Sequence, residues 1–166
     1  MFSEFFLWVH SYNPTLRSDM NTDIIIDLGI FCKMYQVHQL LNQASDALQD
    51  IFRRSSTAIT PEIITKIYEN TPDGSILQDL FSLRFAMTFE PSRTGFESRH
   101  RDNYQRWKET FQSFPNFGRD YFKHCLLGDI KLNYFGTCRF HDHSNICGWT
   151  RQEPYERRPC PYRNDA

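Results

Sequence analysis

The chain lacks an excess of charge of either sign, and it lacks a long apolar run. Its 166 residues hold 19 Lys and Arg against 20 Asp and Glu, for a formal net charge of −1. A net charge this close to zero means that the chain as a whole has no excess positive charge to attract nucleic acid or an anionic membrane. The longest apolar run is only a few residues, whereas a membrane-spanning helix needs about 20. We therefore expect no membrane partner.

The short motifs of common enzyme classes are also missing. The seven glycines are scattered and form neither GxGxxG nor GxxxxGK, the loops that cradle nucleotide phosphates. No serine stands in a GxSxG elbow. The first residues contain Glu4, no leading Lys or Arg and no small-residue cleavage site, so they make a poor signal peptide. We expect a chain that is not an enzyme, with no catalytic and no cofactor-binding residues.

Cysteine is sparse, and its pattern does not predict a disulfide framework. The number of cysteines is odd, their spacing is irregular, and a chain of this length can build a core without cross-links. This usage indicates a reducing compartment, cytoplasmic or nuclear. The five positions are Cys32, Cys125, Cys138, Cys147 and Cys160.

Aromatic residues are abundant, and apolar residues recur at helical spacing. Fifteen Phe and eight Tyr help to make the chain 16% aromatic, enough to bury a core. Phe2, Phe5, Phe6 and Val9 repeat as one face of a helix does. The pattern predicts a mainly α fold of six or seven helices. We expect these helices over about 2–9, 24–35, 39–53, 61–69, 76–89, 102–113 and 116–127.

Hydroxyl, carboxyl and amide side chains mark several of the helix starts. Thr22 or Asp23 can cap the second helix, because either side chain can accept a bond from a first-turn N–H group. Thr60 stands before a proline and an acid, which is a typical helix start. Ser75 follows a Pro-Asp-Gly turn and can cap the next helix, and Asn116 is expected to cap the last one.

The opening helices resemble the closing half of a fungal BTB/POZ domain. Phe2, Phe5 and Trp8 match the F-x-x-F-x-x-W helix in the middle of such a domain. The helix pair that follows it in the family, L-x-x-F-A-D-K-Y-x-V-x-x-L, is matched by Asp27, Leu28, Phe31, Lys33, Tyr35, Val37 and Leu40, and then by Asn42, Ala44, Asp46 and Ala47. Residues 67–75 resemble a Y-E-N-T-P-x-G-S turn found after the domain, and 115–117 and 138–143 resemble the ends of these proteins.

The chain also differs from the family pattern at several points. His10 stands where the family usually has Tyr, and His38 where it usually has Pro. The family's N-terminal strands, which form the sheet and most of the dimer surface, would precede Phe2 and are expected to be missing. The resemblance implies a partial BTB/POZ domain over 1–54. The residues that follow predict a helical extension over 55–127, a Cys/His hairpin over 128–150 and, from the prolines among charges, a disordered tail over 151–166.

One cluster has the character of a metal site. Cys138, His141, His143 and Cys147 follow the spacing C-x2-H-x-H-x3-C, and four such side chains can enclose a tetrahedral zinc ion. A site with four protein ligands leaves no open position for water, so the zinc would be structural. The alternative is a polar hairpin in which these residues are incidental.

Other titratable residues are interpreted as structural. A basic run with interleaved aromatics could follow a single nucleic-acid strand, but acids interrupt it, so we interpret it as a solvated helix flank without a nucleic-acid partner. The basic residues of the run are Arg93, Arg99, Arg101, Arg106 and Lys108. We expect Asp46 on a solvated helix face and His124 partly exposed near a helix C-terminus.

The predicted function depends on the apolar faces of the first two helices. They are expected to pack on the later helices or to stay exposed as an adhesive surface. By resemblance, the leading function is non-enzymatic protein–protein interaction, with a BTB-type dimer partner or a cullin-type ubiquitin-ligase scaffold. The alternatives are a structural zinc-binding module with a nucleic-acid partner, and a truncated fragment without function.

Overall fold

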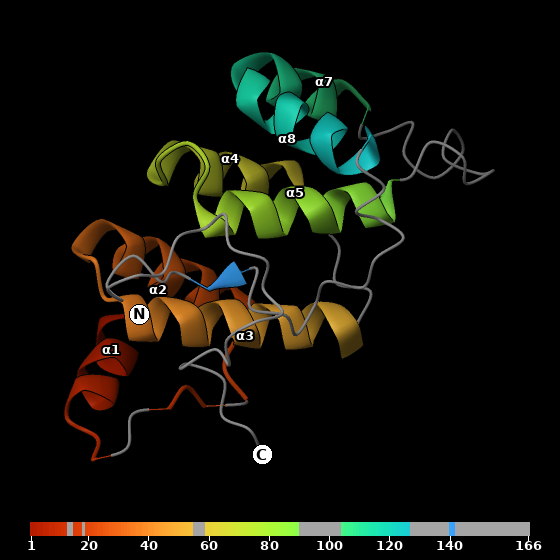
Figure 1. Cartoon of the computed structure of the whole chain (residues 1–166). Helices are drawn as coiled ribbons and strands as arrows, with labels where there is room; N and C mark the ends of the chain where they lie inside the picture. The colour runs from red at the N-terminus through yellow and green to blue at the C-terminus, as the bar shows by residue number, and fades with distance from the viewer. Residues whose placement is uncertain (13–14, 18, 55–58, 90–103, 127–139, 142–166) are drawn as a thin grey trace, which may run out of the picture. The chain divides into compact units, whose positions relative to one another are not determined.

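The computed structural model describes residues 1–12, 15–17, 19–54, 59–89, 104–126 and 140–141. Within these ranges the chain forms helices and no strand, so the predicted mainly α fold is confirmed (Figure 1). The helices are α1 (Phe2–Val9), α2 (Thr22–Tyr35), α3 (His38–Arg54), α4 (Pro61–Asn70), α5 (Ile76–Thr88), α7 (Tyr104–Ser113) and α8 (Pro115–Leu126).

The chain divides into two compact units. Unit 1 comprises Met1–Ser56 together with Phe135–Ala166, and unit 2 comprises Thr57–Tyr134. The described part of unit 1 contains α1, α2, α3 and the pair Phe140–His141. Apart from that pair, the Cys/His hairpin and tail predicted over 128–166 lie outside the described residues.

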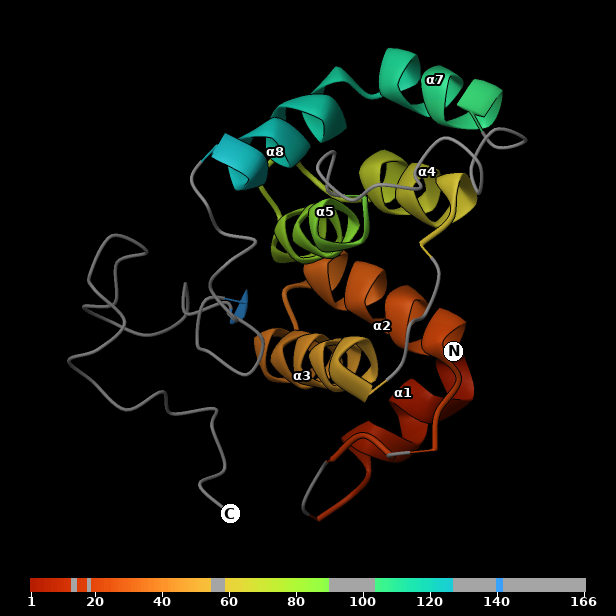
Figure 2. The same cartoon turned by 90° about the vertical axis from the view of Figure 1, so that its right-hand side faces the viewer.

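In unit 1, α2 and α3 form a helical hairpin around a small apolar core (Figure 2). The side chain of Asn21 accepts a hydrogen bond from the N–H of Asp23 and so caps α2. The predicted cap, Thr22 or Asp23, is therefore wrong by one or two residues, because the chain enters the helix earlier. Gln36 takes a left-handed conformation with φ 57° and reverses the chain into α3. The core of the hairpin consists of Leu28, Cys32, Leu40 and Leu41.

The α3 helix also buries polar side chains, which its apolar repeat did not predict. Asn42, Ser45 and Gln49 follow one another at spacings of three and four residues and are all buried. They therefore form a polar stripe on one side of the helix. Gln49 donates a hydrogen bond from Nε2 to Asp46 Oδ1 at 3.3 Å. Such a partner matters because burying a polar group without a hydrogen bond lowers the stability of the fold.

In unit 2, the predicted helix starts of α4 and α5 are confirmed. Thr60 Oγ1 accepts from the N–H of Ile63, and Ser75 Oγ accepts from the N–H of Gln78 at 3.2 Å. Asn116 does not cap α8, because the helix already begins at Pro115. Its side chain instead donates to Asp73 Oδ1 at 2.6 Å, which joins the start of α8 to the α4–α5 turn.

Phe117 on α8 lies at the centre of the aromatic core of unit 2. Its side chain is fully buried, and its ring meets those of neighbours at centroid distances from 4.9 to 6.3 Å. Aromatic pairs at such distances add to the stabilisation that burial itself supplies. The rings around it are those of Tyr68, Phe85, Trp107 and Phe111.

Replacing Phe117 by Ala should lower the free energy of unfolding by about 3–5 kcal/mol, since the change leaves a cavity the size of an aromatic ring. The matched control is Phe122→Ala, in the same helix but 61% exposed, which should change it by less than about 0.5 kcal/mol. Urea unfolding of the full chain, followed by circular dichroism, measures both values. Equal effects of the two substitutions would contradict this assignment of the core.

Candidate functional site

The α1 helix is attached to the hairpin along one side only. Phe5 and Trp8 are partly buried and pack against the hairpin core. The indole Nε1 of Trp8 donates to Gln43 Oε1 on α3 at 2.8 Å, which fixes the rotation of the helix about its own axis. None of the residues of α1 is fully buried. The helix therefore keeps most of its apolar side chains away from the core.

These side chains join with the end of α2 to form an exposed aromatic surface. We define this surface by Phe2 and Phe6 on α1 and by Phe31, Met34 and Tyr35 on α2. The exposed fractions are 69% for Phe2, 63% for Phe6, 63% for Met34 and 64% for Tyr35. The Phe31 ring joins the two helices, at centroid distances of 5.9 Å from Phe2 and 4.5 Å from Tyr35. Several large exposed apolar side chains on two neighbouring helices are uncommon on a surface without a partner.

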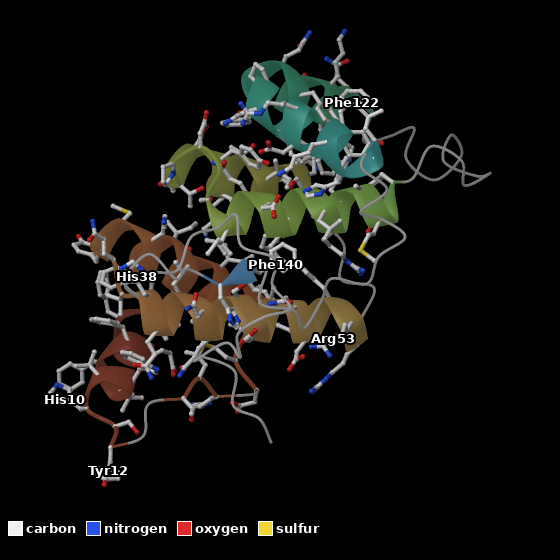
Figure 3. All side chains as sticks on the ribbon, in the orientation of Figure 1. His10, Tyr12, His38, Arg53, Phe122 and Phe140 are labelled. Carbon is white, nitrogen blue, oxygen red and sulfur yellow. The ribbon has the colours of Figure 1, made fainter. Side chains whose placement is uncertain are left out.

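The border of the surface at the end of α1 carries two further rings. His10 lies 4.2 Å from Phe6, measured between ring centroids, and Tyr12 is fully exposed. Figure 3 shows both side chains projecting outward from this end of the helix. Neither was predicted to belong to a surface. The ring of His10 lies beside that of Phe6 and extends the surface at this end.

The apolar residues of α2 divide between the hairpin core and the exposed aromatic surface. The inward residues Leu28 and Cys32 make the hairpin core, whereas Phe31 and Tyr35 lie one turn apart on the neighbouring side. The apolar face of α2, which was expected either to pack or to stay exposed, therefore does both. The side that carries Phe31 and Tyr35 contributes to the aromatic surface.

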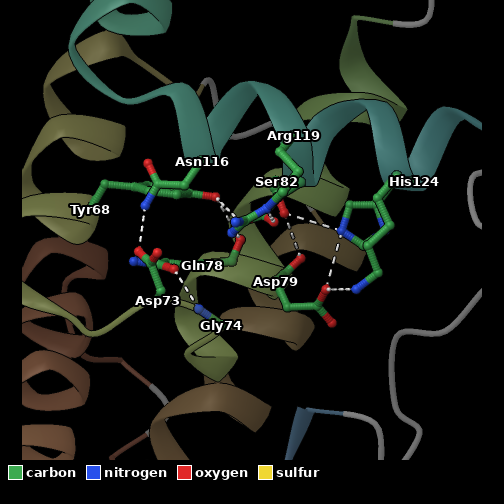
Figure 4. A network of polar contacts seen from close by, with 11 residues as sticks. Tyr68, Asp73, Gly74, Gln78, Asp79, Ser82, Asn116, Arg119 and His124 are labelled. Carbon is green, nitrogen blue, oxygen red and sulfur yellow. Dashed lines mark hydrogen bonds and ion pairs between the residues drawn. The ribbon is translucent and has the colours of Figure 1, made fainter.

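A network of polar contacts connects α4, α5 and α8 in unit 2 (Figure 4). His124, expected to be partly exposed, is fully buried, so that prediction is wrong. Its Nε2 atom lies 3.1 Å from Ser82 Oγ and 3.3 Å from Asp79 Oδ1. Lys123 Nζ lies 3.4 Å from the same carboxylate oxygen. The packing of α8 on α5 brings His124 to these residues, which are more than 40 positions away.

The combination of Ser82, His124 and Asp79 does not have the geometry of a catalytic triad. In a triad the serine contacts one ring nitrogen of the histidine and the acid contacts the other. Here both partners contact Nε2, so the acid cannot orient the ring for proton transfer from the serine. Both Ser82 and His124 are also fully buried, so a substrate could not reach them. The arrangement suits a structural role.

The second part of the network is the pair Tyr68 and Asp120. Tyr68 donates its hydroxyl to Asp120 Oδ2 at 3.1 Å, and Arg119 Nε donates to the other oxygen of that carboxylate at 3.3 Å. Burial, with the charge of Asp120 next, raises the pKa of the Tyr68 phenol. The phenol therefore stays protonated and remains a donor. The pair ties α4 to α8.

Of the predicted zinc ligands, only His141 lies within the described residues. Its Nε2 atom lies 2.8 Å from Asp46 Oδ1 on α3, and the adjacent Phe140 is fully buried. Asp46 keeps 44% of its side chain exposed on α3 and also contacts this residue, which is 95 positions away. Cys138, His143 and Cys147 lie outside the described residues. No group of three metal-ligating side chains occurs within the described ranges, and the zinc site stays a prediction.

Unit 2 has an open groove of about 450 Å³ between α4 and α7. Its lining is mostly polar, and Arg106 forms an ion pair across it with Glu62. Arg106 belongs to the basic run that was interpreted as a solvated flank, and this pairing engages one of its charges. No helix in the described ranges is long and apolar enough to cross a membrane.

Cys32 should be much less reactive in the folded chain than in the unfolded chain. Burial raises the pKa of its thiol from 9.0 to about 12, so at pH 8 the reactive thiolate should be scarcer by roughly a thousandfold. Alkylation by iodoacetamide, resolved by residue with mass spectrometry, compares the native chain with the chain in urea. Labelling of Cys32 at the same rate in both conditions would rule out this burial.

The predicted zinc site can be tested by metal analysis of the purified chain. If the four residues bind zinc, the protein should hold about one equivalent, and the double change of Cys138→Ser and Cys147→Ser should remove it. Cys125→Ser, in α8, is the matched control and should leave the metal content unchanged. The prediction fails if the metal content of the double variant equals that of the unaltered chain.

Comparisons with known proteins add no relative to this description. No family model, no curated protein and no solved structure matches the chain. Among the described residues, the exposed aromatic surface of α1 and α2 is the strongest candidate for a functional site.

Proposed function

We propose that this chain is a non-enzymatic protein–protein interaction module that binds its partner through the aromatic surface. The observation that carries the proposal is the exposure of Phe2, Phe6, Met34 and Tyr35 around the Phe31 ring. Each of these side chains would gain from burial, since removing apolar area from water supplies about 25 cal/mol per Å². Aromatic residues and Met are also enriched at the centres of protein interfaces.

The way in which α1 is attached supports the same function. Because Phe5 and Trp8 hold the helix to the hairpin, the exposed rings of Phe2 and Phe6 are fixed in place before a partner arrives. A surface that is already ordered loses less conformational entropy on binding. Order of this kind suits a recognition surface better than a mobile apolar segment.

The resemblance to a BTB/POZ domain supports a particular kind of partner. It covers the same helices, since Phe2, Phe5 and Trp8 lie on α1 and Phe31 and Tyr35 lie on α2. By this resemblance the chain would act as an adaptor, binding a BTB-type protein or a cullin-type ubiquitin-ligase scaffold. The proposal of a surface stands independently of the choice between these two partners.

Phe6→Ser and Tyr35→Ser should each weaken binding of a purified cullin-type scaffold or BTB-type protein, and together by at least roughly a hundredfold, as the loss of two central anchors does. Both residues are exposed, so the helix content should not change. Phe122→Ser is the matched control, since it removes an exposed Phe outside the aromatic surface. Biolayer interferometry with the full chain measures the affinities.

Two results would contradict the proposal. One is a partner that binds Phe6→Ser and Tyr35→Ser as tightly as the unaltered chain. The other is an equal loss of binding with Phe122→Ser, which would place the interaction elsewhere or indicate a general loss of structure.

A further inference from the structure

The α1 helix lies over the apolar core of the α2–α3 hairpin, although little of the helix itself is enclosed. Phe5 and Trp8 pack against this core, which includes the fully buried Cys32. We infer that α1 is a detachable cover, which opens while the hairpin stays folded and thereby makes Cys32 accessible. The cover goes beyond the proposed function and does not depend on it.

On its own, α1 is too short to be a stable helix. It has eight residues, whereas isolated helices shorter than about 12–15 residues are marginal in water. Met1 stands at its N-cap without a side-chain capping bond, and its last turn contains no basic residue to offset the helix dipole. The carboxylate of Glu4 lies 3.8 Å from the exposed Arg17, and a surface pair of this kind adds little stability. The helix therefore depends on its contacts with the hairpin.

These contacts come from one side of α1 and are modest. The Phe5 ring lies 4.8 Å from the Phe31 ring, measured between centroids. Trp8 Nε1 donates to Gln43 Oε1 at 2.8 Å, in a part-buried position. Both Phe5 and Trp8 are only partly buried, and no residue of α1 is fully buried. Detaching the helix therefore gives up only a small part of the apolar contacts of unit 1.

The hairpin beneath α1 is held together more firmly. The four side chains of its core, two from α2 and two from α3, are each at most 1% exposed. When α1 leaves, the contacts between these two longer helices remain. Elements with few buried apolar contacts open at a lower free energy than the elements that hold the core. We therefore expect α1 to open before the hairpin unfolds, with the closed form as the major one.

A partner on the aromatic surface would hold the cover closed. This surface is built from both elements, since Phe2 and Phe6 lie on α1 and Phe31 and Tyr35 lie on α2. A partner that buries side chains of both helices binds the closed form better than the open one, so it lowers the population of the open form. This second step rests on the proposed function and deepens it.

Labelling of Cys32 measures the opening in the full chain. Iodoacetamide should reach the thiol in the open form, and mass spectrometry resolves the labelled residue. The rate without urea should exceed the rate extrapolated from global unfolding, and it should change little at low urea, because the opening of one short helix exposes little surface. A rate that follows the global unfolding line at every urea concentration would overturn the cover.

Two variants separate the opening of α1 from the unfolding of the hairpin. Trp8→Phe removes the donor to Gln43 and should speed the labelling of Cys32 about three- to tenfold, as the loss of one hydrogen bond does. Ala44→Gly is the matched control, because it weakens α3 by a comparable amount through helix propensity and lies outside the cluster that α1 packs against. It should leave the rate unchanged. Equal acceleration by both variants, or none by Trp8→Phe, would contradict the inference.

The same measurement tests the effect of a partner. A purified BTB-type or cullin-type protein that binds through Phe6, added at about ten times its Kd, should slow the labelling of Cys32 about tenfold. If such a protein leaves the rate unchanged, the closing effect is wrong, whereas the cover and the proposed function stand. If Cys32 shows no separate opening while binding still requires Phe6, the cover is wrong and the proposed function stands.

Discussion

The attachment of α1 through Phe5 and Trp8 determines what the rest of unit 1 can do. An eight-residue helix that carries five large apolar side chains between Phe2 and Trp8 cannot turn all of them toward one hairpin. The Trp8–Gln43 hydrogen bond selects the side that faces inward. Phe2 and Phe6 are then left outside, and the Phe31 ring connects Phe2 to the end of α2. The exposed aromatic surface is thus a consequence of one docking geometry.

The two units differ in where their apolar side chains lie. In unit 2, Phe117 lies within a cluster of rings, and polar side chains such as Tyr68 and His124 find charged or hydroxyl partners nearby. These contacts hold its helices together and leave no geometry suited to catalysis at the Ser82–His124–Asp79 contact. In unit 1, apolar side chains remain in contact with water around Phe31. Unit 1 therefore carries the surface that would gain most from binding a partner.

Local sequence signals predicted the helices and two of the four expected helix caps, whereas contacts between distant residues were not predicted. Thr60 and Ser75 cap α4 and α5 as expected, because a cap depends on neighbours three residues away. His124 was misjudged because its environment is made by residues more than 40 positions distant in the sequence. The periodicity of α2 identified an apolar helix, but periodicity alone could not say that the hairpin would use Leu28 and Cys32 and leave Tyr35 exposed.

Amide hydrogen exchange of the full chain, measured with and without a bound partner, tests most directly whether the aromatic surface is the place where this protein binds. Binding through the surface should slow exchange in α1 and in the second half of α2, and should leave α7 unchanged. Slower exchange confined to the helices of unit 2, with α1 exchanging as fast as before, would contradict the role assigned to Phe2, Phe6 and Tyr35.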